Sequence, residues 1–189
     1  MTYRRYAISE AVGVVVIYSA AVLLHFIYPL SGGSTLAVIF GAVNESVWEH
    51  VKIFTAAYCG YALLQLLWVR VPFKRYIVGK CCGLYLLIGG IIGFFYLYTG
   101  ITGEPILWVD VTSGAVITAL AQLCSYLVTV KWKNAEEYFI PALLLIMLYY
   151  LMFFSFTVFP PRTGLFRDPV TGGYGILGAH TELTSALRI

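Results

Sequence analysis

A short polar run interrupts an apolar part of the chain and holds most of the residue types that could bind a ligand or do chemistry. It reads Asn44-Glu45-Ser46-Val47-Trp48-Glu49-His50-Val51-Lys52 and contains two carboxylates, an imidazole, an ammonium, an indole and an amide. If the run is helical, successive residues rotate by about 100°, which places its charged residues on one face and Val47 and Val51 on the opposite face. That pattern is typical of a helix that lines a polar interior.

Ionised side chains are expensive in a membrane, at about 2.5–3.5 kcal/mol each on insertion scales, so we expect these to be paired, solvated or functional. The structural alternative is an internal network in which Glu49 pairs with Lys52 at i, i+3, and Glu45 pairs with His50 or a serine hydroxyl. The functional interpretation is a ligand pocket. We then expect its binding residues to be Asn44, Glu45, Trp48, Glu49, Lys52, Asp110 and Arg162.

Carboxylates and imidazoles together suit either a divalent cation or general acid–base catalysis. On a regular helix His50 is rotated by about 100° from Glu49, so Glu45, Glu49 and His50 cannot all ligate one ion. In an enzyme, Glu49 or Asp110 would be the base, His50 an acid or base, and Lys52 or Arg162 would hold an anionic headgroup. The predicted ligands of a divalent metal ion are Glu45, Glu49, His50 and Asp110.

The composition of the chain indicates an integral membrane protein. Apolar residues make up 60% of the chain and charged residues 11%, and the mean hydropathy is +0.85, whereas soluble domains carry about 25% charged residues. Membrane lipids are therefore expected partners, and binding of nucleic acid is excluded. Four cysteines lie in or beside apolar stretches without C-x-x-C spacing, which indicates buried thiols.

Apolar stretches of about 20 residues predict an all-α, polytopic transmembrane bundle with five spans. The expected spans are 8–29, 47–70, 76–99, 106–130 and 138–159. The chain from Ser34 to Arg70 contains no proline, and as one helix it would measure about 55 Å against a hydrocarbon core of about 30 Å. We therefore predict a break between about residues 40 and 50, with a short re-entrant or interfacial helix at 34–43 before the second span.

The basic residues predict that the N-terminus lies inside. Eight of the twelve Lys and Arg residues fall at 4–5, 70–80 and 131–133, whereas the connections 30–34 and 100–105 contain none. Since short cytoplasmic loops are rich in Lys and Arg, the chain is expected to be a multi-pass protein of the cell membrane with its C-terminus outside. Glu10 is expected to pair with Arg4 or Arg5.

Several further polar residues fall in the predicted outer half, among them His25, Glu104, Asp110 and His180. The external tail 160–189 is rich in turn residues and is expected to fold as a cap over the outer face. The transmembrane domain would then comprise 1–159. We predict that this cap covers one pocket faced by Asn44, Glu45, Trp48, Glu49 and Asp110.

Small residues indicate how the spans pack, because helices in lipid approach closely where side chains lack bulk. Gly89 and Gly93 form a G-x-x-x-G pair in the third span. This pair either packs within the chain or forms the face of a homodimer.

The tail reads Pro160-Pro161 and then Leu165-Phe166-Arg167-Asp168-Pro169-Val170-Thr171-Gly172-Gly173-Tyr174-Gly175-Ile176. With this tail and the polar run 44–52 at the second span, the chain resembles a family of small bacterial integral membrane proteins of unknown function. The resemblance covers nearly the whole chain, and it implies no activity, substrate or catalytic residue.

Two classes of function follow from these residues. In the first, an outward-facing pocket of carboxylates and histidine binds or transports a cation or a small polar solute. In the second, a membrane-embedded enzyme acts on a lipid or lipid-linked substrate at the outer leaflet by general acid–base or metal-assisted chemistry. The sequence contains no recognisable nucleophile motif for the second class.

Overall fold

The computed structural model describes residues 2–176, which form helices and connections with no strand beyond an isolated bridge between Arg167 and Tyr174. The short 3-10 turns η1 (Ala135–Tyr138) and η2 (Gly164–Phe166) precede and follow the last long helix. The predicted all-α class is confirmed. The α-helices are α1 (Thr2–Leu30), α2 (Thr35–Phe40), α3 (Val47–Gln65), α4 (Phe73–Thr102), α5 (Leu107–Lys131) and α6 (Phe139–Val158).

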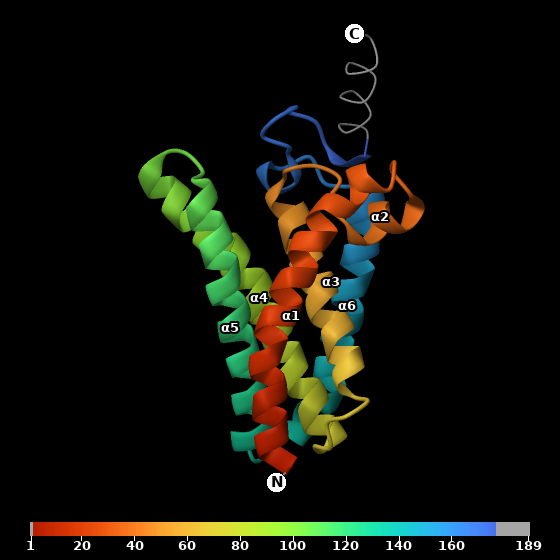
Figure 1. Ribbon diagram of the computed structural model, residues 1–189, viewed down its shortest axis with the longest axis vertical. Helices are drawn as coiled ribbons and strands as arrows, with labels where there is room; N and C mark the ends of the chain where they lie inside the picture. The colour runs from red at the N-terminus through yellow and green to blue at the C-terminus, as the bar shows by residue number, and fades with distance from the viewer. Residues whose placement is uncertain (1, 177–189) are drawn as a thin grey trace.

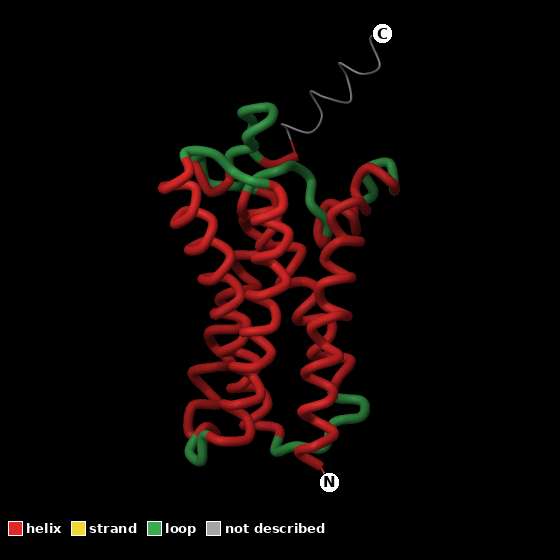
Figure 2. Tube along the Cα trace, turned by 60° about the vertical axis from the view of Figure 1, so that its left-hand side comes forward, coloured by secondary structure: helices red, strands yellow, loops and turns green. Residues whose placement is uncertain are grey.

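The long helices run side by side along the molecule, and their connections lie at its two ends (Figure 1 and Figure 2). We call the end with the start of α1 the lower end and the opposite end the upper end. Helix α1 packs against α3 and α5, and α4 packs against α3, α5 and α6. At the upper end the α4–α5 hairpin leans away from α1 and α3 (Figure 1).

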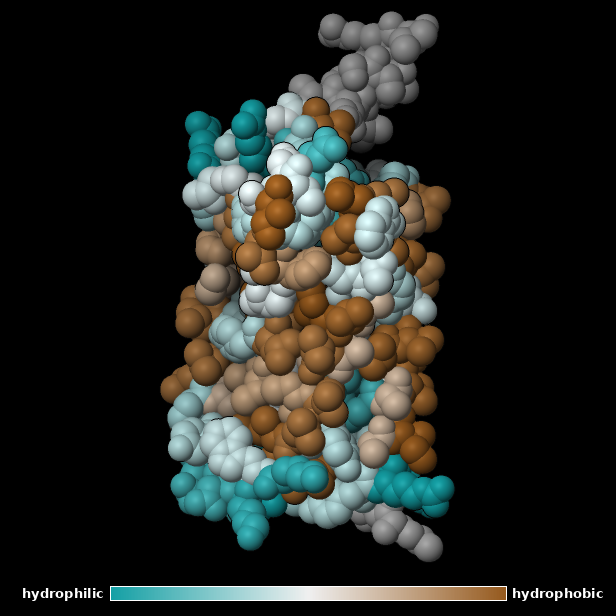
Figure 3. All heavy atoms as spheres, turned by 90° about the vertical axis from the view of Figure 1, so that its left-hand side faces the viewer, coloured by the Kyte–Doolittle hydropathy of each residue, from teal (hydrophilic) through white to brown (hydrophobic). Residues whose placement is uncertain are grey.

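Within residues 2–176, four helical segments are long and apolar enough to cross a membrane, which indicates a membrane protein. They are Tyr3–Leu30, Phe73–Thr102, Leu107–Lys131 and Ala135–Val158. Figure 3 shows the corresponding apolar surface across the middle of one face, with polar side chains gathered toward both ends. Helix α3 is not one of the four, because Glu49, His50 and Lys52 lower the hydropathy of its first turns, so a fifth span stays a prediction.

The chain from Ser34 to Arg70 is broken, as its length predicts. Helix α2 ends at Phe40 and α3 begins at Val47. The helix begins there because Ser46 caps it by accepting the Glu49 N–H, while the Asn44 side chain accepts the Ser46 N–H at 2.9 Å. Asn44 and Glu45 therefore precede the helix, and the single helical face expected for the whole polar run is wrong.

A different pair of glycines from the predicted one brings the helices together. A Cβ placed on Gly79 would lie 2.7 Å from the Ser125 carbonyl oxygen, and one on Gly83 would lie 2.7 Å from that of Ala121. These two glycines therefore let α4 approach α5 closely. Added Cβ atoms at Gly89 and Gly93 meet no other described residue within 4 Å, so this pair does not pack within the described chain, and a homodimer face there stays a prediction.

A buried ion pair joins α1 and α4 in the lower half. The Lys80 ammonium donates to both carboxylate oxygens of Glu10, at 2.8 and 2.9 Å, and to the Gln122 side-chain oxygen at 3.3 Å. Ser125 donates to the same carboxylate at 3.3 Å. The expected pairing of Glu10 with Arg4 or Arg5 is wrong, because both arginines are exposed at the lower end while Glu10 faces the bundle interior.

Candidate metal centre

Two histidines and one carboxylate from three different elements meet at the upper end. His25 comes from the last turns of α1, Glu45 from the connection between α2 and α3, and His50 from the first turn of α3. The His25 Nε2 atom lies 3.6 Å from Glu45 Oε1, and the His50 Nε2 atom lies 3.7 Å from Glu45 Oε2. One possible ligand atom from each residue fits within 4.8 Å of the other two.

The imidazole of His50 is oriented by the backbone one turn earlier. Its Nδ1 atom lies 3.0 Å from the Ser46 carbonyl oxygen. A carbonyl can only accept, so the proton of this contact lies on Nδ1, and in the neutral ring the Nε2 lone pair faces Glu45. A histidine held in this way through its second nitrogen is typical of a metal ligand.

The imidazole of His25 faces the same carboxylate from the other side. Its ring centroid lies 5.3 Å from that of His50, and the ring of Phe26 packs against it in a T-shaped arrangement at a centroid distance of 4.9 Å. Its Nδ1 atom is buried and has no hydrogen-bond partner within residues 2–176. His25 therefore contacts Glu45 through Nε2, while its Nδ1 atom, unlike that of His50, has no partner within the described residues.

A buried ion pair positions the connection that carries Glu45. Lys52 and Glu49 are paired at 2.6 Å, and their side chains are 0% and 4% exposed. Glu49 accepts the Val43 N–H at 2.9 Å, and Lys52 donates to the Val38 carbonyl at 3.1 Å. The pair thus satisfies backbone groups that the break between α2 and α3 leaves without helical partners.

This arrangement keeps Glu49 and Lys52 apart from the more exposed cluster of His25, Glu45 and His50. Their charged groups bind each other and the backbone of residues 38–43, whereas the side chains of His25, His50 and Glu45 are 25%, 37% and 49% exposed. The structure brings together Glu45 and His50 of the predicted metal ligands and adds His25. The i, i+3 pairing of Glu49 with Lys52 expected in the structural alternative is confirmed, and it places Glu49 outside the cluster.

The predicted site residue Asp110 lies on another part of the molecule. It is in the first turn of α5, where its carboxylate accepts the Tyr98 hydroxyl at 2.6 Å, and that hydroxyl accepts the Ile106 N–H at 3.1 Å. These contacts hold the α4–α5 hairpin, which leans away from α1 and α3 (Figure 1). Asp110 is therefore not part of the described His–Glu cluster.

The segment after α6 lies over the start of α3. The indole of Trp48 packs against Phe166 and Phe156 at centroid distances of 5.1 and 5.3 Å, and the Asn44 side chain donates to the Gly175 carbonyl at 3.4 Å. These two predicted binding residues thus hold the segment that covers the upper end. Arg162 is exposed in the same segment, and His180 lies outside the described residues.

The donor set of His25, Glu45 and His50 fits a divalent transition metal. Two imidazole nitrogens and one carboxylate are ligands that Zn²⁺ accepts, and such three-ligand sites keep a position for water or substrate. Ligand atoms on a tetrahedral zinc ion are about 3.4 Å apart, close to the observed 3.6 and 3.7 Å. Sequence reasoning placed His25 in the outer half but did not predict its contact with Glu45, since no local spacing connects the two.

These features define an all-helical protein with helices that could cross a membrane and a His–Glu cluster at one end. The chain belongs to a family of unknown function, DUF6512, whose model matches residues 2–176. Membership agrees with the resemblance to a family of unknown function, and it supplies no activity. Comparisons with curated proteins and with solved structures give no match.

Proposed function

We propose that this protein is a multi-pass membrane protein that binds a divalent transition-metal ion, of the Zn²⁺ class, at its outer end. The observation that carries the proposal is the meeting of His25 Nε2 and His50 Nε2 on the two oxygens of Glu45. His25, Glu45 and His50 would be the ligands. The partial exposure of all three supports access from the surrounding solution.

Charge distribution supports this orientation. Arg4, Arg5, Lys74 and Lys133 are exposed near the lower end, and the positive-inside rule places such segments in the cytoplasm. The His–Glu cluster at the upper end would then face the outside. The membrane concerned would be the cell membrane.

In this conformation the bundle of residues 2–176 offers a surface site for a cation but no open path for transporting it across the membrane. Below the cluster, α1, α3 and α4 are closed by buried apolar residues such as Ile17, Ile53 and Leu87. Lower still, the Glu10–Lys80 pair is buried. Transport would require both the apolar residues and the Glu10–Lys80 pair to separate. We therefore propose that this conformation binds the cation at the outer face.

The test is metal binding by the purified full-length protein after chelation. Titration with Zn²⁺, followed by calorimetry, should give one site per chain, and Co²⁺ should give the visible spectrum of a low-coordinate site. His25→Ala, Glu45→Gln and His50→Ala should each lose binding. Affinity should also fall toward acidic pH, because a protonated imidazole cannot bind a metal.

Two variants serve as controls and separate this site from the others considered. Glu104→Gln removes an exposed carboxylate at the same end, and Asp110→Asn removes the predicted ligand on α5. Both should bind Zn²⁺ as the unmodified chain does. If the His25 and His50 variants retain full affinity, or if Asp110→Asn loses it, the three-residue centre is wrong.

The donor set also favours a second candidate, metal-assisted hydrolysis at the outer leaflet. Two histidines and one glutamate are the protein ligands of several hydrolytic zinc sites, in which the ion activates a bound water. The exposed side of Glu45 would admit a lipid-linked substrate. Release of product from chromogenic ester and phosphodiester lipids by the Zn²⁺-loaded protein, lost in His50→Ala, would support this candidate over simple binding.

A further inference from the structure

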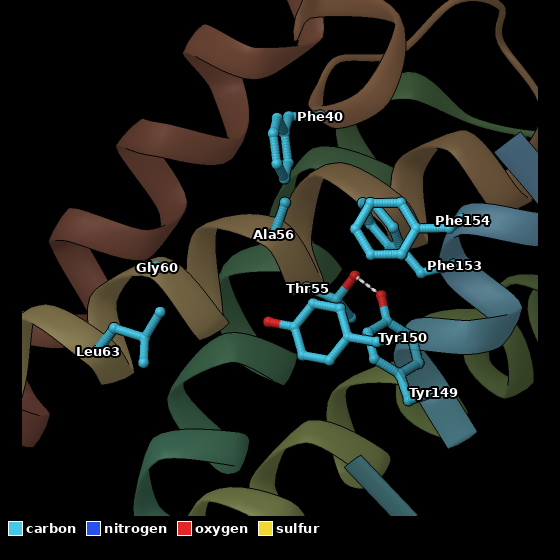
Figure 4. Close-up of a pocket in the computed structure, with 9 residues that line it drawn as sticks. All are labelled: Phe40, Thr55, Ala56, Gly60, Leu63, Tyr149, Tyr150, Phe153 and Phe154. Carbon is cyan, nitrogen blue, oxygen red and sulfur yellow. Dashed lines mark hydrogen bonds between the residues drawn. The ribbon is translucent and has the colours of Figure 1, made fainter. Parts of the chain in front are cut away.

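A groove of about 310 Å³ runs between α3 and α6, below α2 (Figure 4). One wall is formed by small residues of α3, including Ala56 and Gly60, and the other by four aromatic rings of α6 between Tyr149 and Phe154. Phe40 of α2 closes the upper end. We infer that this groove binds one acyl chain of a membrane lipid, independently of the metal centre.

The walls of the groove suit a hydrocarbon rather than water. The hydroxyls of Thr55 and Tyr149 bind each other, and Thr55 also donates to backbone carbonyls of its own helix. These two hydroxyls therefore need no further partner, which leaves the Tyr150 hydroxyl as the polar group that points into the groove. Ordered water requires two to four polar partners, and an empty space would forfeit the dispersion contacts of the aromatic rings.

The surroundings of α6 indicate that the occupant comes from the membrane. The segment Ala135–Val158 is apolar enough to span, and only 17% of its most apolar window is buried within the described chain. Most of α6 therefore faces hydrocarbon. Since the groove opens on this helix, acyl chains are the molecules that reach it.

The shape of the groove favours an acyl chain over a helix of a second copy. Helices in membranes approach closely along stripes of small residues, whereas this groove has aromatic rings along one side and at its upper end. A helix is about 10–12 Å wide and would rest on these rings without filling the space between them. From Thr55 to Leu63 the groove extends about 12 Å along α3, which suits one extended chain.

Gly60 provides a sharp test. A Cβ placed on it meets no other described residue within 4 Å, so a larger side chain can start there without a clash at Cβ and would extend into the groove. Gly93 of α4 is equally open and lies outside the groove. Gly60→Leu and Gly93→Leu therefore form a matched pair.

The experiment uses the full chain in vesicles of phosphatidylcholine that carries a photoactivatable diazirine in one acyl chain. After illumination, mass spectrometry should locate labelling mainly in 55–63 and 149–154. Gly60→Leu should lower this labelling several-fold, and Gly93→Leu should leave it unchanged. Native mass spectrometry of the unmodified chain in detergent should show one retained lipid, which Gly60→Leu loses.

Other outcomes would overturn the inference. They are labelling spread evenly over the exposed helix faces, or equal labelling of Gly60→Leu and the unmodified chain. If Leu63→Cys forms disulfide-linked dimers in the membrane while the groove stays unlabelled, a second copy occupies it. Should Gly60→Leu fail to fold, Leu63→Trp fills the lower part of the groove and must reduce labelling in the same way.

Discussion

Removal of Lys80 should destabilise the protein strongly, whereas removal of Lys80 together with Glu10 should not. The ammonium makes contacts of 2.8 and 2.9 Å with the Glu10 carboxylate, and the two residues are 4% and 3% exposed. Lys80→Met would leave the carboxylate buried with Ser125 and without its cation. Breaking a buried ion pair in this way costs about 3–5 kcal/mol.

The double variant Glu10→Gln, Lys80→Met removes both charges and keeps side chains of similar volume. Replacement of a complete buried pair by uncharged side chains of similar volume is often neutral or stabilising. The effects of Glu10→Gln and Lys80→Met on the free energy of unfolding should therefore be strongly non-additive, with a coupling of about 2 kcal/mol or more. The double variant should be more stable than Lys80→Met.

The assay is thermal unfolding of the purified protein in detergent, followed by tryptophan fluorescence and circular dichroism. A loss of 3–5 kcal/mol corresponds to a decrease in Tm of about 6–20 °C on the scale of soluble chains of this size. Lys74→Met changes an exposed lysine and should stay within about 0.5 kcal/mol. Equal Tm values for Lys80→Met and Lys74→Met would refute the assignment of a stabilising buried pair.

Three further outcomes are expected. Gly83→Ala should destabilise by about 1–3 kcal/mol through overpacking against α5, whereas Gly89→Ala should stay within about 0.5 kcal/mol, as thermal unfolding of both will show. Lys52→Met should lower Tm and also weaken Zn²⁺ binding in a calorimetric titration, because the connection that carries the carboxylate ligand loses its anchor. In a background without native cysteines, a cysteine at Ser31 should react with an impermeant thiol reagent added to intact cells, and one at Lys74 should react only after lysis; the reverse pattern would invert the proposed orientation.

The helical part of the fold follows from hydropathy because each helix in a membrane protein satisfies its own backbone. The apolar stretches 106–130 and 138–159 lie close to α5 (Leu107–Lys131) and α6 (Phe139–Val158). The break between α2 and α3 follows from the length of the segment 34–70 together with the polar run 44–52 that divides it. These properties are local, so a single sequence contains them.

The lateral packing of helices is not local, and the sequence does not reveal it. The Glu10–Lys80 pair joins residues 70 positions apart, and hydropathy does not indicate which faces of α1 and α4 meet. The same limit applies to His25 and Asp110. Both were expected in the outer half, but only His25 faces Glu45, because α1 packs against α3 whereas the upper part of α5 leans away.

The position of the Glu49–Lys52 pair explains how the connection between α2 and α3, which is buried at Ala42, Val43 and Ser46, can hold an exposed metal ligand at Glu45. Glu45 lies in the connection between α2 and α3, where the backbone has no helical partners of its own. The buried pair supplies these partners at Val38 and Val43, so a movement of the connection would break hydrogen bonds to two buried charges. An arriving ion would thus meet a carboxylate that is already in place and would not have to order the connection, which lowers the free-energy cost of binding.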